Sequence, residues 1–272
     1  MDINQLLKTT RQYFWDKEFT EVEVNYLNRS LPLEPNLYSF KVNDWYLPTS
    51  PEFALKELLA KSPQNCFAIG HCFRNLESTS LWHTPEFLML EWYEVGKNLE
   101  DLKQSTQEYI HLFLPNIKFS EFKIPPNNFD NEPDFNQFFL NVVEPSLPHD
   151  GAVFVTGYPA FLSPLAQRKP HGVNGFSEAF NTPVLTGEEK LFTSVRFELY
   201  INGIEIANAC EENRDAESIK SAFLQEEKYR LENHLPTHPI SDKFVENCSN
   251  IPLCSGIGLG IDRLLKIING VY

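Results

Sequence analysis

The chain has 272 residues, of which 42% are hydrophobic, enough to bury the core of one large domain or of two small ones. Its formal net charge of −14 disfavours broad binding to nucleic acid, because that binding depends on Lys and Arg side chains that displace counterions from phosphates. No apolar run approaches the roughly 18 residues of a membrane helix, and the N-terminal residues lack the apolar region of a signal peptide.

The cysteines and histidines form no recognisable metal or disulfide motif. The five cysteines are odd in number and include no CxxC pair, which indicates reduced thiols in a cytoplasmic protein. The seven histidines include no HExxH motif and no Cys/His cluster, so the sequence predicts no structural zinc site.

The first predicted helix begins after Asp2, whose carboxylate can accept hydrogen bonds from the free amides of the first turn. Residues 21–24 then alternate like a strand, and residues 37–42 and 45–47 flank an Asn-Asp pair that predicts a hairpin turn. The apolar side chains that share one face of the first helix are Ile3, Leu6, Leu7, Tyr13 and Phe14.

A second helix is expected to start at Ser50-Pro51-Glu52 and to run to about Ala60. Serine is a capping residue, proline suits the first helical position, and an acid is favoured near the positive end of the helix dipole. The segments that follow are strands at 66–71 and 87–93, a polar connector at 75–84, a helix at 99–113, and breaker-rich stretches at 123–134 and 164–190. Loops as long as these last two are usually functional or mobile.

The clearest local pattern is RFELYINGIEIANA at 196–209, where Asn202-Gly203 is the preferred type I′ turn between two alternating strands. Asp215 caps a further predicted helix that reaches about Asn233. Residues 255–268 form a glycine-rich strand that enters a last helix. Hairpins with helices inserted between them predict a mixed, mostly antiparallel sheet flanked by helices, which is an α+β fold.

Gly256, Gly258 and Gly260 alternate along the last predicted strand, with GxGxG spacing that differs from the dinucleotide-binding GxGxxG. Glycines at alternate positions leave one strand face without side chains, so a flat ligand can lie against the backbone. Arg263, at the start of the next helix, could then stack on the ring of that ligand. The simpler alternative is a strand packed closely against its neighbour.

The stretch CFRNLESTSLWHTPEFLMLEWY, residues 72–93, adds a cation and a row of side chains on one strand face. Arg74 is a candidate bidentate phosphate ligand, and Phe87 is placed where an aromatic side chain could cover the second face of a ring. Glu91 and Tyr93 lie two residues apart and project from the same face as Phe87. A carboxylate beside a phenol makes an ammonium site.

Glu205, Asn208 and Glu212 are candidate oxygen ligands in IEIANACEEN. Glu205 and Asn208 lie on opposite faces of a regular strand, so only a bend or a bulge could bring the three together. With such a bend they suit Mg²⁺, which takes carboxylates together with substrate phosphates. The alternative is a solvated strand edge.

These motifs together resemble the catalytic domain of a class II aminoacyl-tRNA synthetase of the lysine/aspartate/asparagine subgroup. FRN…HTPEFLMLEWY is similar to the second motif of that class and GIGLGIDRLL to the third. SPLAQ at 163–167 and the 196–209 hairpin resemble the lysine branch in particular, and the match runs from about Thr10 to the C-terminus. The resemblance implies the class II α+β fold, with a mostly antiparallel sheet flanked by helices.

Lysyl-tRNA synthetases carry an anticodon-binding barrel before this domain, whereas here the first helix of the resemblance starts at residue 2. We therefore expect a single catalytic domain over 1–272. The resemblance is strongest to the stand-alone paralogues that attach β-lysine to elongation factor P. The segments that favour them are TSPE at 49–52, MLEWY at 89–93, IEIANA at 204–209 and LPTHPI at 235–240.

The resemblance also implies roles for individual residues. ATP would contact Arg74, Glu77, His83, Thr84, Phe87, Glu205, Ile206, Gly260 and Arg263, of which Arg74, Glu205 and Arg263 would be catalytic. The lysine-like amino acid would contact Ser50, Glu52, Glu91, Tyr93, Asn208, Glu212 and Gly258. Mg²⁺ would be held by Glu205 and Glu212. Three pocket carboxylates suit a substrate with two ammonium groups.

The chain departs from the family pattern at several positions. Asn25 stands where the first motif has proline, Leu76 lengthens the second motif, and Thr84 replaces an asparagine. Cys210 falls in a run that is more aromatic in the family. Gly258 matches lysyl-tRNA synthetases, whereas the β-lysine ligases carry alanine, so the choice between α- and β-lysine stays open.

The sequence therefore predicts an ATP-dependent ligase of the cytoplasm that forms an aminoacyl-adenylate and transfers lysine or β-lysine to elongation factor P. The docking patch is expected in the loops at 123–134 and 164–190, with Arg168, Lys169 and His171. A homodimer is expected through the first helix and residues 21–24. Two alternatives remain. One is a truncated synthetase-like enzyme with another acceptor, including tRNA, although the acidic charge of the chain disfavours tRNA. The other is a non-catalytic regulatory paralogue.

Overall fold

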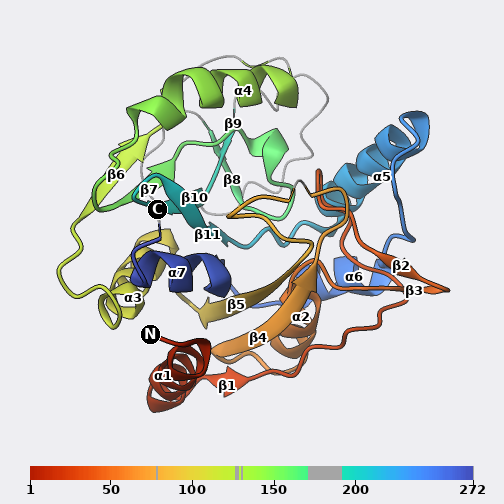
Figure 1. The fold of residues 1–272 in the computed structure, drawn as a ribbon. Coiled ribbons are helices and arrows are strands. Elements are labelled where there is room, and N and C mark those ends of the chain that lie inside the picture. The colour runs from red at the N-terminus through yellow and green to blue at the C-terminus, as the bar shows by residue number, and fades with distance from the viewer. Residues whose placement is uncertain (78, 126–128, 130, 171–191, 272) are drawn as a thin grey trace.

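The computed structural model describes residues 1–272 except 78, 126–128, 130, 171–191 and 272 (Figure 1). Its α-helices are α1 (Ile3–Asp16), α2 (Glu52–Lys61), α3 (Leu99–His111), α4 (Glu132–Phe138), α5 (Ala216–Glu232), α6 (Asp242–Asn250) and α7 (Ile261–Ile268). Short π- and 3₁₀-helical segments are η1 (Phe139–Val143), η2 (Glu144–Ser146) and η3 (Ala160–Leu162).

The strands are β1 (Thr20–Glu21), β2 (Lys41–Val42), β3 (Trp45–Tyr46), β4 (Cys66–Phe73), β5 (Glu86–Val95), β6 (Phe119–Lys123), β7 (Ala152–Thr156), β8 (Arg168–Pro170), β9 (Phe192–Ser194), β10 (Arg196–Ile201), β11 (Ile204–Glu211) and β12 (Cys254–Gly260). Eight of them form one sheet in the order β1-β4-β5-β12-β11-β10-β7-β6, in which only the outermost pairs, β1 with β4 and β6 with β7, are parallel. The mostly antiparallel sheet with flanking helices confirms the α+β prediction.

One face of this sheet is apolar. Along β5 and β12 the buried side chains of Leu90, Trp92, Ile257 and Leu259 belong to one cluster with residues of α1, α3 and α7. Because side chains alternate along a strand, the positions between them point to the opposite face. In the register, Gly258 of β12 lies opposite Glu91 of β5 on that second face.

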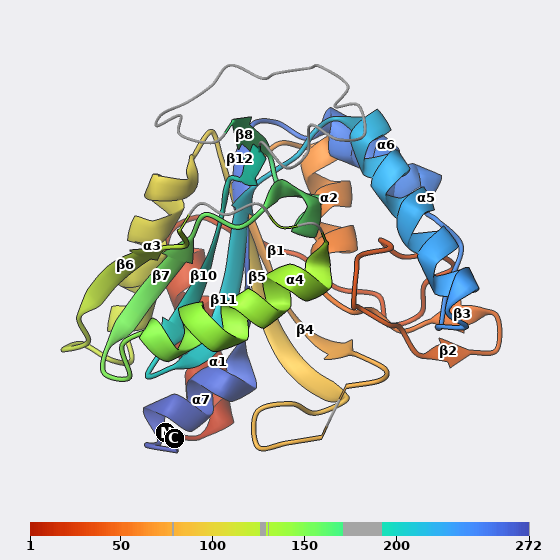
Figure 2. The same ribbon diagram turned by 90° about the horizontal axis from the view of Figure 1, so that it is seen from above.

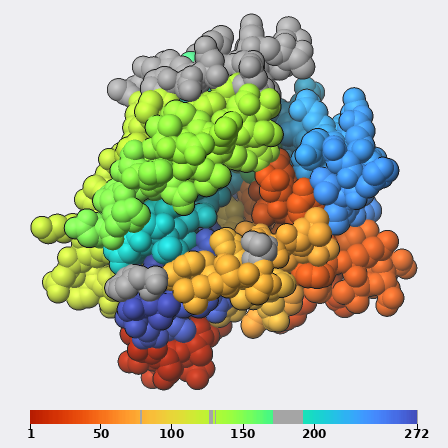
Figure 3. All heavy atoms as spheres, turned by 45° about the horizontal axis from the view of Figure 1, so that its top comes forward, coloured from red at the N-terminus to blue at the C-terminus, as the bar shows by residue number. Residues whose placement is uncertain are grey.

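The second face is open between two groups of helices. On one side α2 and α6 pack together, with α5 beside them, and on the other side α4 and η1 pack over β7. Figure 2 shows α2, α5 and α6 together to the right of the central strands and α4 crossing in front of these strands. Figure 3 shows the surface hollowed between the green segment around α4, the blue α5 and the orange residues after β4.

The helix starts predicted at Asp2 and Asp215 and the turn predicted at Asn202-Gly203 are confirmed. The Asp2 carboxylate accepts from the amide of Gln5 at the start of α1, and the Asp215 side chain caps α5 in the same way. Asn202 and Gly203 have φ values of 51° and 79°, as the type I′ turn between β10 and β11 requires.

Three predicted elements differ in extent. The strand expected at 21–24 is reduced to β1, because its ladder with β4 ends after the Val22 amide donates to the Phe67 carbonyl. The hairpin expected at 37–47 keeps only two residues in each strand. Ser50 is not the cap of α2: Pro51 takes that position, and the Ser50 hydroxyl accepts from the Glu52 amide at 3.4 Å.

Two further sequence expectations concern thiols and membrane spans. All five cysteines are free, and every one except the half-buried Cys210 is buried, as predicted. No helix within the described ranges is long and apolar enough to cross a bilayer. Of the two breaker-rich loops, 123–134 is described only in part, and most of 164–190, including His171, lies outside the described residues.

Candidate active site

The open face of the sheet holds two joined cavities, of about 710 Å³ and about 1090 Å³. Both lie over β5, β11 and β12. The residues that line both cavities are Arg74, Met89, Glu205, Asn208 and Gly258. These shared residues show that the two cavities adjoin, so two bound ligands could meet there.

All nine residues predicted to contact ATP line the smaller cavity, and all seven predicted to contact the amino acid line the larger one. They come from α2, the connector after β4, β5, β11, β12 and α7, so the fold gathers residues that are distant in the sequence. Trp82 and Lys266 also line the smaller cavity and were missed by the sequence analysis.

Arg74 offers a cation at the junction of the two cavities. Its guanidinium carbon lies 5.0 Å from the centre of the Phe87 ring, and its Nε donates to the Thr49 carbonyl at 3.5 Å. Among the described residues no ion pair within 4.0 Å involves Arg74. The guanidinium is therefore placed by weak contacts and is available for an incoming anion.

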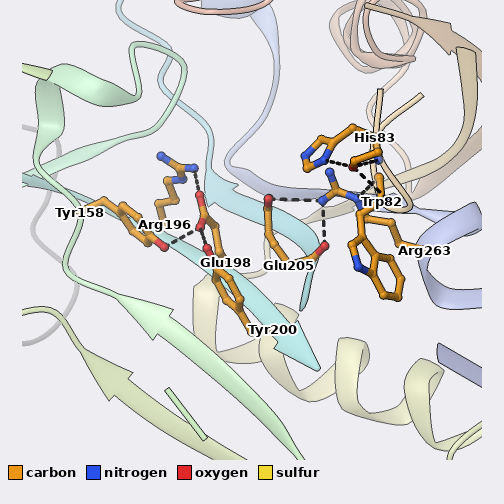
Figure 4. Close-up of polar contacts among 9 residues, drawn as sticks. Trp82, His83, Tyr158, Arg196, Glu198, Tyr200, Glu205 and Arg263 are labelled. Carbon is orange, nitrogen blue, oxygen red and sulfur yellow. Dashed lines mark hydrogen bonds and ion pairs between the residues drawn. The ribbon is translucent and has the colours of Figure 1, made fainter. Parts of the chain in front are cut away.

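Arg263 is already fixed by the protein. It donates from Nε to the Trp82 carbonyl at 3.1 Å and from Nη1 to the Glu205 carbonyl at 2.8 Å, with the Glu205 carboxylate at 3.4 Å (Figure 4). These bonds hold the planar guanidinium at the wall of the smaller cavity and tie the connector after β4 to α7. Such a plane can stack on a purine without further ordering.

The connector also brings His83 and Thr84 to the smaller cavity. Burial lowers the pKa of His83, and the positive charges of Arg263 and Arg74 lower it further, so the imidazole is neutral at neutral pH. Its Nδ1 lies 3.0 Å from the Ser80 hydroxyl. The Thr84 hydroxyl donates to the Glu86 carbonyl at 2.6 Å, which orders the entry into β5.

Glu91 and Tyr93 form the expected carboxylate and phenol pair in the larger cavity. Glu91 is only 5% exposed, and the Tyr93 hydroxyl donates to its Oε1 at 2.9 Å. Burial raises the pKa of Glu91 well above its usual range, and repulsion from Glu52 adds to the shift. A buried carboxylate of this kind gains from a neighbouring ammonium.

Lys56 is the main residue that the sequence analysis missed at this end of the site. Its fully buried Nζ lies 2.6 Å from Glu52 Oε1 and 2.6 Å from Glu212 Oε2. Burial lowers the pKa of Lys56, but the two carboxylates outweigh that effect and hold it well above its ordinary value. Glu52 and Glu212 therefore already share a protein cation. The spacing of Glu52 and Lys56, four residues apart on one helix, is the signal that could have revealed this pair.

Gly256 and Gly258 of β12 line the larger cavity. Close packing against a neighbour explains one of these glycines, and an open strand face explains the other. A Cβ atom at Gly256 would lie 2.3 Å from Tyr93 Cε1, so this glycine is needed because the tyrosine ring packs against the backbone. At Gly258 a Cβ atom would lie 3.4 Å from Met89 Sδ and 3.8 Å from Glu91 Oε2, so a methyl group would fit there.

The predicted metal pair of Glu205 and Glu212 stays a prediction, and the positions of the two carboxylates weigh against it. In a regular extended strand, seven residues at about 3.3 Å each would separate the two positions by about 23 Å. Glu212 is engaged by Lys56, and the Asn208 amide oxygen accepts from Arg196 Nε at 2.7 Å. The bend that the prediction required is present, since the register of β10 and β11 shifts between Leu199 and Tyr200.

Glu198, on the neighbouring strand β10, is the acid whose negative charge acts on Glu205 (Figure 4). Its Oε2 accepts from the Tyr158 hydroxyl at 2.6 Å and from the Tyr200 hydroxyl at 2.9 Å, and its Oε1 is paired with Arg196. The signal in the sequence was the alternation of residues 196, 198 and 200 on the predicted strand, which puts a cation, an acid and a phenol on one face.

Glu198 and Glu205 fit a Mg²⁺ ion that is also bound by phosphates. Burial raises the pKa of Glu205, and the negative charge of Glu198 raises it further. A divalent cation between the two would relieve that repulsion. The part of the chain that the structure describes holds no cluster of three or more His, Cys, Asp or Glu placed for a metal ion, so the remaining ligands would have to come from substrate.

Comparison with known proteins agrees with this site. The family model of class II tRNA synthetases (D, K and N) matches residues 3–271. Among curated relatives, an elongation factor P–(R)-β-lysine ligase of Hamiltonella defensa is 28% identical over 96% of this chain and 88% of the relative. Relatives with the same name from Proteus mirabilis and Buchnera aphidicola are 26% and 28% identical, over 98% and 97% of this chain and 90% and 89% of their own lengths. The chain therefore belongs to the class II tRNA synthetase family of the D, K and N type.

Proposed function

We propose that the protein activates lysine or β-lysine with ATP and transfers the aminoacyl group to a lysine side chain of elongation factor P. The observation that carries this proposal is the pair of joined cavities. One end has Arg74, Phe87 and Arg263 for a nucleotide, and the other has the buried carboxylate of Glu91 for an ammonium group. Class II synthetase-like ligases use ATP, and the named relatives are ligases of elongation factor P.

The first step needs positioning and charge stabilisation rather than a protein nucleophile. The carboxylate of the amino acid attacks the α-phosphate of ATP, the bond to pyrophosphate breaks, and an aminoacyl-adenylate forms. Arg74 would stabilise the negative charge that develops on the phosphate, and Arg263 with Phe87 would hold the adenine ring. Mg²⁺, held by Glu198 and Glu205, would neutralise phosphate charge.

In the second step an uncharged lysine amine of the acceptor attacks the adenylate carbonyl, an amide bond forms and AMP leaves. A protein acceptor suits the charge of this chain, because a tRNA would need several Lys or Arg contacts to phosphates, and the net charge is −14. We propose docking near β8, with Arg168 and Lys169. His171 of the predicted patch lies outside the described residues. A translation factor as acceptor would place the reaction in the cytoplasm.

The test is ATP–pyrophosphate exchange with lysine, β-lysine, aspartate and asparagine, followed by transfer of labelled amino acid to elongation factor P or to total tRNA. We expect exchange with a diamino acid only, and label on the factor. Exchange with no amino acid would support a regulatory paralogue. Label on tRNA and not on the factor would support the truncated-synthetase alternative.

A further inference from the structure

The segment before β2 places a fifth carboxylate in the larger cavity, that of Glu34, beside those of Glu52, Glu91, Glu205 and Glu212. Its neighbours Leu31 and Leu33 are buried in the protein, whereas Glu34 is half-buried and lines the cavity with Glu52 and Glu91. Within the described ranges no hydrogen bond or ion pair engages the Glu34 side chain. Glu34 is absent from the set of pocket residues that the sequence predicted.

Arg230 of α5 holds this segment in place from behind. Its fully buried guanidinium donates to the main-chain carbonyls of Glu34 and Leu37, the latter at 3.2 Å, and lies 4.6 Å from the centre of the Tyr38 ring. Its Nε also bonds to the Glu226 carboxylate at 2.6 Å. In Figures 1 and 2 the orange-red segment before β2 runs beside α5. The backbone of Glu34 is thus anchored while its carboxylate is left for a ligand.

The charges of the larger cavity are unbalanced at this end. Lys56 is shared by Glu52 and Glu212, which leaves Glu34 and Glu91 without a cation of their own. Glu91 is more than nine-tenths buried, and its second oxygen, Oε2, makes no hydrogen bond to the described residues and faces the cavity beside Gly258. Two cavity carboxylates that lack cations are what a ligand with two ammonium groups would complete.

We propose that Glu34 binds one of the two ammonium groups of the diamino acid substrate, and that Glu91 with Tyr93 binds the other. This inference rests on the proposed function, since it assigns the amino-acid end of the same site. The pKa of Glu34 agrees with it: burial raises this pKa to about 8, repulsion from Glu52 contributes, and Lys56 and Arg74 only partly oppose the shift. An ammonium bound at Glu34 would remove that cost.

The test compares wild type with Glu34→Gln and with Glu232→Gln, a matched loss of charge at the exposed end of α5. In ATP–pyrophosphate exchange at pH 8.5, above the raised pKa, we expect Glu34→Gln to raise the KM for the diamino acid at least tenfold and to change the KM for ATP less than twofold. Glu34→Asp, which keeps the charge, should recover part of the loss. Glu232→Gln should match wild type.

Two lysine analogues distinguish recognition of an ammonium group from a general effect on the cavity. Norleucine lacks the side-chain ammonium, and 6-aminohexanoate lacks the α-ammonium. As competitors against lysine, both should bind wild type more weakly than lysine does. Glu34→Gln should lose the preference for lysine over one of the two analogues and keep the preference over the other. Glu91→Gln should keep the preference that Glu34→Gln loses, and lose the one that Glu34→Gln keeps.

The outcomes distinguish failure of the proposed function from failure of the role of Glu34. Wild type that exchanges with no amino acid refutes the proposed function. Wild type that exchanges with a diamino acid, together with an unchanged KM in Glu34→Gln, refutes the role of Glu34 alone. Equal loss of preference against both analogues in a variant that melts like wild type also refutes it.

Discussion

Replacing Lys56 by methionine should strongly destabilise the fold, because Lys56 is the cation that keeps two buried acids together. Its Nζ is completely buried and lies 2.6 Å from a carboxylate oxygen of both Glu52 and Glu212. Methionine has a similar length and can fill the space over Phe244, whose ring centre is 5.3 Å from Nζ. The change therefore removes charge with little loss of packing.

The expected loss of unfolding free energy follows from the two carboxylates, Glu52 and Glu212, that lose their cation. Removing one member of a buried ion pair costs about 3–5 kcal/mol, because the remaining charge is buried without compensation. For a chain of this size each kcal/mol lowers the melting temperature by about 2–4 °C, so the expected fall is roughly 10 °C. Lys243→Met is the matched control: Lys243 is an exposed lysine of α6 that pairs with Glu57, and loss of a surface pair costs under about 1 kcal/mol.

The pH dependence has a definite sign. Burial raises the pKa of Glu212 in the wild type and Lys56 opposes that shift, so without Lys56 the folded-state pKa should rise further above the unfolded value. A carboxyl group with a raised folded pKa costs stability as the pH rises from its unfolded pKa to its folded pKa. The gap between Lys56→Met and wild type should therefore widen from pH 5 to pH 8.

The assay is urea unfolding at both pH values, with the double variant Lys56→Met/Glu212→Gln alongside. Neutralising Glu212 removes one of the two unpaired charges, so the double variant should recover part of the stability at pH 8. Equal unfolding free energies for Lys56→Met and wild type at pH 8 would refute the reasoning. So would a double variant that is less stable than Lys56→Met.

Four further predictions concern the site and the assembly. Arg74→Ala should slow adenylate formation by about 2–4 kcal/mol in activation free energy, measured by pyrophosphate exchange in protein that folds normally. Gly256→Ala should displace the Tyr93 ring, from which its Cβ would lie 2.3 Å, and impair amino-acid binding measured by calorimetry. Glu198→Gln should raise the Mg²⁺ concentration needed for half-maximal exchange, whereas Glu212→Gln should leave it unchanged. Sedimentation should show a homodimer through α1, and a monomer at micromolar concentration would contradict this.

The elements that the sequence predicted well are those set by local chemistry. Caps at Asp2 and Asp215 and the turn at Asn202 depend on residues within a few positions, so their patterns identify them directly. The row of side chains on β5 was also predictable, because alternation alone fixes which residues share a face. The extent of β1 was not, since it depends on where the ladder with β4 ends.

The part of the site that could not be predicted depends on which of several possible partners each charged side chain takes. The pairing of Glu212 with Lys56 could not be predicted, because the choice between a protein cation and a ligand depends on distances set by the whole fold. Glu198 was overlooked because its role depends on the bulge in β11 next to Glu205. The sequence analysis considered a bulge only as a way to bring Glu205, Asn208 and Glu212 together. Glu34 lies in a segment with no regular structure and is anchored through a distant helix by Arg230.

The partners of the cations also constrain how the site binds ATP. Arg196 is paired with Glu198, Arg263 contacts Glu205, and Lys56 is shared by two acids at the other end of the cavity. Among the described Lys and Arg side chains that line the two cavities, Arg74 and Lys266 have no ion pair within 4.0 Å. A triphosphate would add several negative charges close to Glu198 and Glu205, and these two cations cannot balance all of them. The nucleotide should therefore bind weakly without a divalent cation. The amino acid should not share this requirement, because the carboxylates of the larger cavity attract its ammonium groups directly.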